Sequence, residues 1–107
     1  MTKYFKEIEY KMDKDFLAKL DKAREYAKMP FVINSAYRSP DHPESIKNPS
    51  SSHIKGLAVD IRTSDSRARY KVLNALMHVG FNRIGIADTF IHVDDDYEKS
   101  SNVIWTY

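Results

Sequence analysis

Three side chains in two short segments of the sequence have the chemistry of metal ligands. His53 and Asp60 lie in the segment SSHIKGLAVD, and His92 lies further along the chain in the segment FIHVD. The sequence has no cysteine, so histidine and carboxylate side chains are the only strong metal ligands available. Two imidazoles and one carboxylate leave a fourth tetrahedral position for water, which is the arrangement of catalytic rather than structural zinc. These three residues are therefore a candidate zinc site.

Two helices are expected among the elements that must position these ligands. Apolar residues at helical spacing predict a helix over residues 14–28, with Asp13 as its N-cap. The same pattern predicts a second helix that is capped by Ser64 or Ser66 and ends near Val79. The apolar stripe of this second helix is expected to comprise Tyr70, Leu73, Leu76 and Met77.

Several β-prone segments are expected to form the sheet that carries the ligands. They cover residues 31–36, 57–62, 83–86, 89–94 and 103–107. Asp60 alternates with apolar residues, so its side chain is expected to point away from the apolar face of its strand. The order of the elements predicts an α+β fold, with helices on one face of a largely antiparallel sheet and the zinc site on the other. The whole chain, residues 1–107, is expected to form a single domain.

The segment around the first two ligands resembles the signature of a known enzyme family. Ser51, His53, Gly56, Ala58 and Asp60 occupy every fixed position of the pattern S-x-H-x-x-G-x-A-x-D, the signature of the zinc D-Ala-D-Ala carboxypeptidase family. This family includes vancomycin-resistance D-Ala-D-Ala dipeptidases and phage L-alanyl-D-glutamate endolysins, and the hedgehog signalling domain has a related fold. The resemblance implies a hedgehog-like fold and a zinc peptidase.

Two further segments extend the resemblance. Residues 35–39, SAYRS, are similar to the S-G-Y-R-S segment of the family, and residues 90–94, FIHVD, resemble its final zinc-ligand strand. The resemblance covers the chain from about Phe31 to Asp94. It is closest to the short, single-domain members found in phages and bacterial genomes, which often end in I-W-x-Y as this chain does.

The resemblance implies a role for each residue of the site. His53, Asp60 and His92 would hold Zn²⁺, and Arg38 would bind a substrate carboxylate or polarise the scissile carbonyl. Ser51 would bind substrate or orient the loop that carries His53. The reaction would be amide hydrolysis, in which zinc activates water and stabilises the oxyanion.

The general base of this reaction is not at the positions that relatives use. In relatives the base is a histidine two residues before the last zinc ligand or an acid three residues before it, whereas Phe90 and Thr89 stand at these positions here. Asp94 is expected on the same strand face as His92, and we expect it to act as the base. Asp88 in the preceding turn is the alternative base, and the alternative role of Asp94 is to orient a zinc ligand.

Other side chains of similar chemistry are expected to be structural. Asp95 and Asp96 are expected to continue the acidic run into a solvated turn, and Trp105 is expected in the core packing of the last strand. His42 is expected in a solvated loop. His78 is expected near the end of the second helix, where it suits the helix dipole.

The function implied by the resemblance is hydrolysis of peptidoglycan peptide bonds at or near a D-amino acid, as a carboxypeptidase or as an endolysin-type endopeptidase. The alternative is a catalytically inactive, zinc-containing module that binds peptidoglycan or serves as a phage structural component. Phe90, at a position where relatives carry their base, favours this alternative. A third possibility is a metal-free structural domain in which the three candidate ligands form a hydrogen-bonded polar cluster.

Composition limits the expected partners. The net charge is +2, from 17 basic and 15 acidic residues that are mixed along the chain, which is not a nucleic-acid-binding pattern. No apolar stretch has the length of a membrane span, and the charged N-terminal residues lack the apolar segment of a signal peptide. We therefore expect a monomer that is synthesised in the cytoplasm, with release to the cell wall or as a phage protein. Its partners are expected to be peptidoglycan peptides, and neither nucleic acid nor a membrane.

Overall fold

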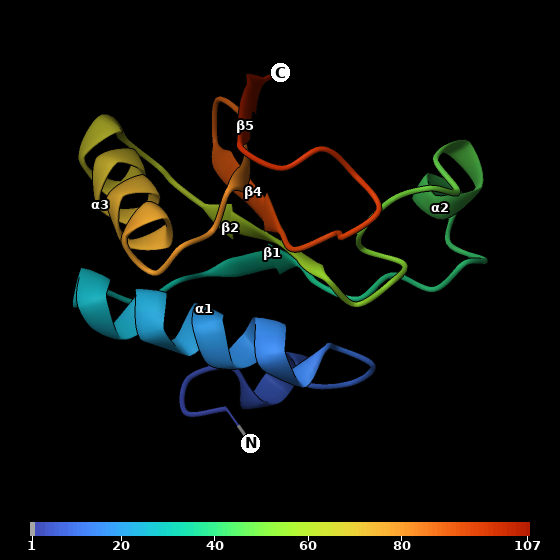
Figure 1. The fold of residues 1–107 in the computed structure, drawn as a ribbon, viewed down its shortest axis with the longest axis horizontal. Coiled ribbons are helices and arrows are strands. Elements are labelled where there is room, and N and C mark those ends of the chain that lie inside the picture. Colours follow the sequence, from blue (N-terminus) through green and yellow to red (C-terminus); the bar gives the residue numbers. More distant parts are fainter. Residues whose placement is uncertain (1) are drawn as a thin grey trace.

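The strands of the computed structural model, which describes residues 2–107, form one mixed sheet (Figure 1). They are β1 (Ile33–Ser35), β2 (Ala58–Arg62), β3 (Arg83–Ile86), β4 (Phe90–Asp94) and β5 (Val103–Thr106). Their order in the sheet is β1-β2-β4-β3-β5, and all neighbours are antiparallel except β3 and β5, which run parallel. The expected strands are confirmed, and the parallel pairing of the last strand makes the sheet mixed.

Three helices accompany the sheet, and a short 3-10 helix, Lys6–Ile8, precedes them. They are α1 (Lys14–Ala27), α2 (Pro43–Lys47) and α3 (Ser66–His78). α1 and α3 were expected, whereas α2 was not and lies on the opposite side of the strands from α3 (Figure 1). His42 begins α2, because its Nδ1 accepts a hydrogen bond from the Glu44 amide at 3.1 Å. Among residues 2–107, no helix has the length and hydropathy needed to cross a membrane.

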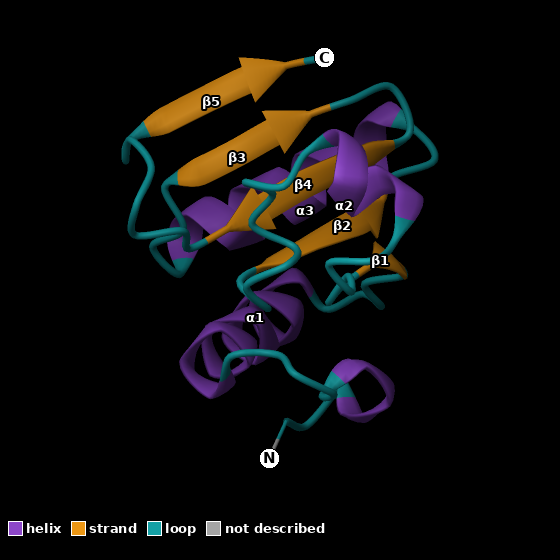
Figure 2. Cartoon of the chain, turned by 90° about the vertical axis from the view of Figure 1, so that its right-hand side faces the viewer, coloured by secondary structure: helices purple, strands orange, loops and turns teal. Residues whose placement is uncertain are grey.

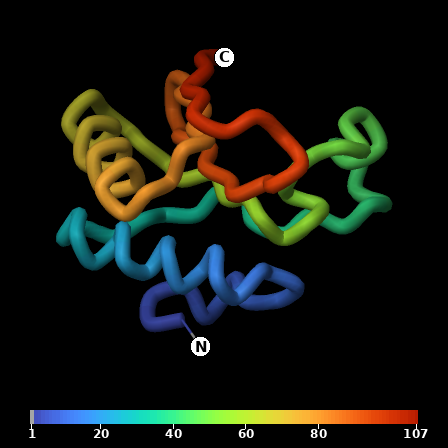
Figure 3. Tube along the Cα trace, viewed as in Figure 1, coloured from blue at the N-terminus to red at the C-terminus, as the bar shows by residue number. Residues whose placement is uncertain are grey.

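The first helix begins where its cap was expected. The carboxylate of Asp13 accepts a hydrogen bond from the Phe16 amide at 2.9 Å, which satisfies one of the free N–H groups at the helix start. After Ala27 the chain leaves the helix through Lys28, whose φ of 56° is left-handed. The residues before α1 fold back beneath the helix (Figure 3), where the Asp21 carboxylate accepts hydrogen bonds from the amides of Lys3 and Tyr4.

The N-cap of α3 lies between the two residues that were expected to cap this helix. Asp65, rather than Ser64 or Ser66, caps α3, and its carboxylate accepts a hydrogen bond from the Ala68 amide at 2.8 Å. Aspartate and serine are both good caps, so the pattern of residue types alone did not choose between neighbouring positions.

The buried stripe of α3 also differs from the expected one. It consists of Val72, Ala75 and Leu76, whereas Tyr70 and Met77 are 69% and 52% exposed. Apolar residues occupy two neighbouring stripes of this helix, and only packing against α1 and the sheet decides which stripe faces inward. The prediction was right for Leu76 and for Leu73, which is half-buried against the core, and wrong for Tyr70 and Met77.

Alternate residues of the two central strands face two different environments. The apolar residues of β2 and β4 that belong to the core are Val59, Ile61, Ile91 and Val93. Asp60 and His92 alternate with them and therefore point to the opposite face of the sheet. Figure 2 shows β2 and β4 side by side in the middle of the sheet, with α2 and the loops near them. The candidate ligands thus project from the face that does not carry the apolar core.

The segment before β2 is fastened to the N-terminal part of the chain at Gly56. The φ of Gly56 is +71°, and a Cβ at this position would clash with the backbone carbonyl of Lys11. The carbonyl oxygen of Gly56 also accepts a hydrogen bond from the Asp13 amide at 2.9 Å. Glycine alone permits this backbone conformation and close approach without strain. The contact fixes the point at which the loop that carries His53 enters β2.

Candidate metal centre

The three candidate ligands come together at the centre of the sheet. Asp60 in β2 and His92 in β4 are direct cross-strand partners, and His53 reaches them from the loop before β2. Nδ1 of His92 lies 3.0 Å from Oδ1 of Asp60, and Nε2 of His53 lies 3.3 Å from the same oxygen. One ligand atom from each residue lies within 4.8 Å of the others, so the three could hold one metal ion. The structure therefore brings together the residues that the sequence singled out.

The imidazole of His53 is oriented by a backbone carbonyl. Its Nδ1 lies 2.9 Å from the carbonyl oxygen of Ala36, which can only accept a hydrogen bond, so Nδ1 carries the proton. In the neutral ring the lone pair is then on Nε2, the nitrogen that faces Asp60. Only 4% of the His53 surface is exposed. The ring is thus held with Nε2 directed into the cluster.

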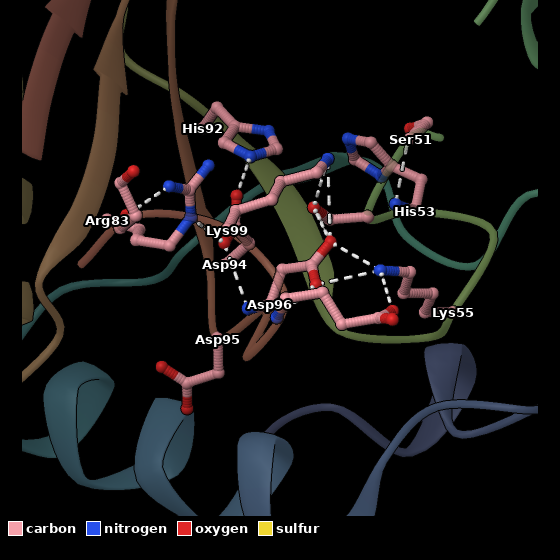
Figure 4. A network of polar contacts seen from close by, with 12 residues as sticks. Ser51, His53, Lys55, Arg83, His92, Asp94, Asp95, Asp96 and Lys99 are labelled. Carbon is pink, nitrogen blue, oxygen red and sulfur yellow. Dashed lines mark hydrogen bonds and ion pairs between the residues drawn. The ribbon is translucent and has the colours of Figure 1, made fainter. Parts of the chain in front are cut away.

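The imidazole of His92 is oriented by a buried carboxylate (Figure 4). Its Nε2 lies 2.7 Å from Oδ2 of Asp94 and donates to it, and its Nδ1 faces Asp60 as the candidate ligand atom. Asp94 is itself held, because its Oδ1 accepts hydrogen bonds from Nε of Arg83 at 2.6 Å and from the Asp96 amide at 3.0 Å. The second candidate ligand is therefore oriented by a side chain that has partners of its own.

The charges of the cluster favour a cation at its centre. Burial raises the pKa of Asp60, but hydrogen bonds with His53 and His92 outweigh it and hold the pKa far below its usual value. Burial lowers the pKa of His92, but its hydrogen bonds with Asp60 and Asp94 raise that pKa above its usual value. Both shifts reflect the attraction between the negative carboxylates and positive charge on the imidazole rings, and a bound metal ion would take the place of that positive charge.

The donor set fits zinc. Two imidazole nitrogens and one carboxylate oxygen are a common protein ligand set for a catalytic zinc ion. In such sites the second nitrogen of each histidine usually donates to a carbonyl or a carboxylate, which fixes the ring. Ala36 and Asp94 provide these two acceptors here. Without a metal, the same two nitrogens, Nε2 of His53 and Nδ1 of His92, can carry protons and donate to Asp60, so the metal-free polar cluster that the sequence left open agrees with these contacts as well.

Arg38 lies beside the cluster, next to β1. Its guanidinium donates to Oγ of Ser35 at 3.0 Å, and Ser35 is the cross-strand partner of Asp60. The Arg38 amide also donates to the carbonyl of His53 at 3.1 Å, so the two loops are joined directly. Arg38 is half-buried. A permanent cation is thereby placed at one side of the candidate metal centre.

Ser51 lies inside the loop that carries His53. It is buried, and its Oγ accepts a hydrogen bond from the His53 amide at 3.3 Å. Of the two roles that the sequence left open, this contact favours orientation of the loop over binding of substrate.

The two candidate bases differ in their surroundings. The carboxylate of Asp94 is 1% exposed and accepts hydrogen bonds from Arg83, His92 and Asp96, so its contacts favour orientation of His92. Its role as general base stays a prediction. Asp88 lies exposed in the turn before β4, where its carbonyl accepts a hydrogen bond from Arg69, and it is not part of the ligand cluster.

Asp96 is a structural residue of the site that the sequence pattern did not indicate. It was expected in a solvated turn, but it is only 2% exposed. Its carboxylate accepts hydrogen bonds from Ser52 Oγ at 2.8 Å and from Lys55 Nζ at 2.8 Å, and Lys99 Nζ lies 3.4 Å away (Figure 4). Burial raises the pKa of Asp96, but the bonds from Lys55 and Ser52 lower it to about 2. Because Ser52 and Lys55 flank His53, Asp96 fastens the loop of the first ligand to the chain after β4.

Trp105 is also placed differently from the expectation. It is half-buried on the same face as His92 rather than in the apolar core, and the two ring centroids are 5.6 Å apart. The reason is the parallel pairing of β5 with β3, which aligns Trp105 with Gly85. His78, in contrast, has a structural contact as expected, because it stacks on Tyr26 with centroids 3.8 Å apart.

An α+β domain with such a His–Asp–His donor set on one face of its sheet has the features of a metal-binding domain. A model of the family Peptidase M15 matches residues 2–94 of the chain. The match covers most of the chain, and the chain therefore belongs to the Peptidase M15 family. Peptidases of this family depend on zinc, which agrees with the donor set. The comparisons with curated proteins and with solved structures found no match.

Proposed function

We propose that the protein is a zinc-dependent peptidase that hydrolyses peptidoglycan peptide bonds at or near a D-amino acid. Membership of the Peptidase M15 family supports the reaction class. The observation that carries the proposal is the ligand geometry. His53, Asp60 and His92 present their ligand atoms to one point, and the outer nitrogen of each imidazole is already bound to an acceptor. The ligands are therefore arranged before the metal binds.

The residues around the metal have separate tasks in this proposal. A bound Zn²⁺ would supply Lewis-acid chemistry, because it makes water a nucleophile at neutral pH and stabilises negative charge on the carbonyl oxygen. Arg38, held by Ser35 beside Asp60, would bind a substrate carboxylate or the polarised carbonyl through its guanidinium. Ser51 would hold the His53 loop through the His53 amide.

The general base in this proposal would be Asp94, because Phe90 and Thr89 stand at the positions where relatives carry their base. Asp94 lies 2.7 Å from Nε2 of His92, and its carboxylate accepts the hydrogen bond that holds that ring. Its other oxygen is occupied by Arg83 and by the Asp96 amide. Orientation of His92 is the role that these contacts support best.

One observation favours a second candidate function. Phe90 stands where relatives carry a base, and Asp94 is fully engaged by its neighbours. A protein with this arrangement could keep zinc and bind peptidoglycan without hydrolysing it. This candidate, a zinc-containing binding or phage structural module, predicts stoichiometric zinc with no turnover.

The experiment that separates the two candidates is a cleavage assay with zinc-loaded protein. Stem peptides that end in D-Ala-D-Ala and peptides that contain an L-Ala-D-Glu bond are incubated with the protein, and the products are identified by mass spectrometry. We expect cleavage of one of these bonds. Arg38→Ala is expected to lower kcat/KM by roughly 10- to 100-fold, the effect of losing one charged hydrogen bond. Arg67→Ala, at an exposed position of α3, is the matched control and is expected to leave kcat/KM unchanged.

Zinc-loaded protein that cleaves none of these peptides would contradict the peptidase and support the binding module. In that outcome, binding of the same peptides is measured by calorimetry. Binding that depends on Arg38 would then be the property that the site retains.

A further inference from the structure

One row of residues crosses the whole sheet on the face of the metal centre. The backbone register pairs Ser35 of β1 with Asp60, Asp60 with His92, His92 with Gly85 of β3, and Gly85 with Trp105 of β5. Paired residues of neighbouring strands point to the same face of a sheet. The candidate ligands therefore occupy the middle of the row, and the positions on either side of them can contact the same bound molecule.

The β3 position of this row carries no side chain. A Cβ at Gly85 would lie 2.6 Å from Cε2 of Trp105, which is closer than any real Cβ contact. The indole of Trp105 thus lies across the backbone of Gly85 and approaches His92, with ring centroids 5.6 Å apart. Glycine at this position lets a residue of the edge strand line the metal centre.

Two further aromatic rings continue this surface. Phe90 precedes His92 by two residues in β4 and shares its face, and its ring lies 5.4 Å from that of Tyr107. Burial raises the pKa of the Tyr107 phenol, a hydrogen bond with Trp105 lowers it, and the negative charges of Asp60 and Asp94 raise it further. We call Phe90, Trp105 and Tyr107 the aromatic wall.

The two sides of the metal centre differ in charge. Next to β1, the guanidinium of Arg38 is held by Ser35. Next to β5, the three residues of the aromatic wall carry no charge, and the nearest cation on this face by strand register is the exposed Arg62 of β2, the cross-strand partner of Phe90. Arg83 lies against the Trp105 ring, 5.2 Å from its centroid, but its guanidinium is already engaged by Asp94 and by the Ser100 carbonyl. Strands lie about 4.8 Å apart, so this row has room for a few residues of an extended peptide.

We propose that Trp105 is a specificity-determining residue, and that the aromatic wall binds an uncharged, apolar side chain of the substrate next to the scissile bond. The carboxylate of the same substrate would face Arg38 on the other side of the metal. The face of an aromatic ring binds apolar groups in proportion to the apolar area that becomes buried, and it repels anions because it carries partial negative charge. An acidic side chain at the wall would therefore bind less well. This inference rests on the proposed function, since it assigns an orientation to the substrate of that site.

The inference is tested with amino-acid hydroxamates, which bind zinc directly and need no turnover. Binding of D-leucine hydroxamate and D-glutamate hydroxamate to zinc-loaded protein is measured by calorimetry. We expect the leucine compound to bind wild type roughly 10-fold more tightly than the glutamate compound. Trp105→Ala is expected to remove this preference while zinc content remains stoichiometric. Trp105→Phe, which keeps an aromatic ring, is expected to retain part of it.

Three further variants make the test specific to the wall. Gly85→Ala adds a methyl group that displaces the indole, so it is expected to lower the preference as Trp105→Ala does. The double variant is expected to lose no more than Trp105→Ala alone, because both changes remove the same contact. Ile104→Ala is the matched control. Ile104 is the neighbour of Trp105 in β5, points to the other face and is 52% exposed, so the preference should be unchanged.

The measurements distinguish failure of this inference from failure of the proposed function. Zinc-loaded Trp105→Ala that keeps the preference of wild type would overturn the inference and leave the proposed function intact. Loss of zinc in both Trp105→Ala and Trp105→Phe would also overturn it, because Trp105 would then serve His92 rather than the ligand. Wild-type protein that binds no zinc after zinc is added would contradict the proposed function itself.

Discussion

The two histidines of the candidate metal centre are held in different ways. His53 lies on a loop, and a backbone carbonyl, that of Ala36, fixes its ring. His92 lies in the central strand β4, and a side chain, the carboxylate of Asp94, fixes its ring. The backbone of the first histidine needs support from outside the loop, whereas the backbone of the second is fixed by pairing with strands on both sides.

Each half of the site is therefore vulnerable at a different place. No substitution can remove the carbonyl that orients His53, so this half depends on contacts that keep its loop in place, above all those of Asp96 with Ser52 and Lys55. The other half depends on one buried pair, Arg83 and Asp94. We therefore expect substitutions in the two halves to have different consequences, with metal affinity affected on the strand side and stability on the loop side.

The largest expected effect is on the strand side. Asp94→Asn removes the negative charge that orients His92, and we expect zinc affinity to fall by roughly 10- to 100-fold, as is typical for partners of metal-bound histidines. The measurement is a competition titration with a chromophoric zinc chelator. Asp88→Asn, at an exposed carboxylate outside the cluster, is the control and should bind zinc like wild type. Unchanged zinc affinity with loss of hydrolysis in Asp94→Asn would instead assign Asp94 as the general base.

The next effect concerns the loop side and its dependence on pH. The pKa of Asp96 is about 2 in the folded protein, below the ordinary value of 3.8. A lowered carboxyl pKa stabilises the folded state above pH 4, and this stabilisation is lost as the pH falls from about 4 towards 2. Asp96→Asn should therefore lower the free energy of unfolding at neutral pH by about 2 kcal/mol. In this variant the free energy of unfolding should also decrease less than in wild type as the pH falls from about 4 towards 2.

This prediction is checked by urea unfolding at several pH values. Asp95→Asn is the matched control, because the neighbouring Asp95 pairs with Lys19 of α1 and not with the His53 loop. Equal pH dependence of Asp96→Asn and wild type between pH 4 and 2 would show that the contacts of Asp96 contribute nothing to folding.

The smallest expected effect is that of Ser51. Ser51→Ala removes the acceptor of the His53 amide inside the loop, and we expect a loss of about 1 kcal/mol in the free energy of unfolding. Zinc affinity should change little, because the Ala36 carbonyl still fixes the ring. Ser39→Ala, at an exposed serine, serves as the control. A raised KM with unchanged stability would assign Ser51 to substrate binding instead.

The ligands and the elements that carry them could be predicted from sequence because both are local. A short motif contains His53 and Asp60, and the alternation of apolar residues around Asp60 and His92 predicts strands and the faces of their side chains. The Asp13 cap of α1 was predicted for the same reason. Each of these patterns can be recognised from a few neighbouring residues alone.

The errors concern contacts between distant parts of the chain. Asp96 is buried because Ser52 and Lys55, far away in sequence, bind its carboxylate. Trp105 lines the metal centre because β5 pairs in parallel with β3 and because Gly85 leaves space for the indole. Neither residue type nor local spacing carries this information, so an acidic run looked solvated and a tryptophan looked like part of the core.

The most direct test of the account is the zinc content of dialysed protein. Wild type, His53→Ala and His92→Ala are prepared identically, together with His78→Ala, whose ring stacks on Tyr26 and takes no part in the cluster. We predict about one zinc per chain in wild type and in His78→Ala, and little in the other two variants. Stoichiometric zinc in His53→Ala or His92→Ala, or negligible zinc in wild type even after zinc is added back, would contradict the metal centre.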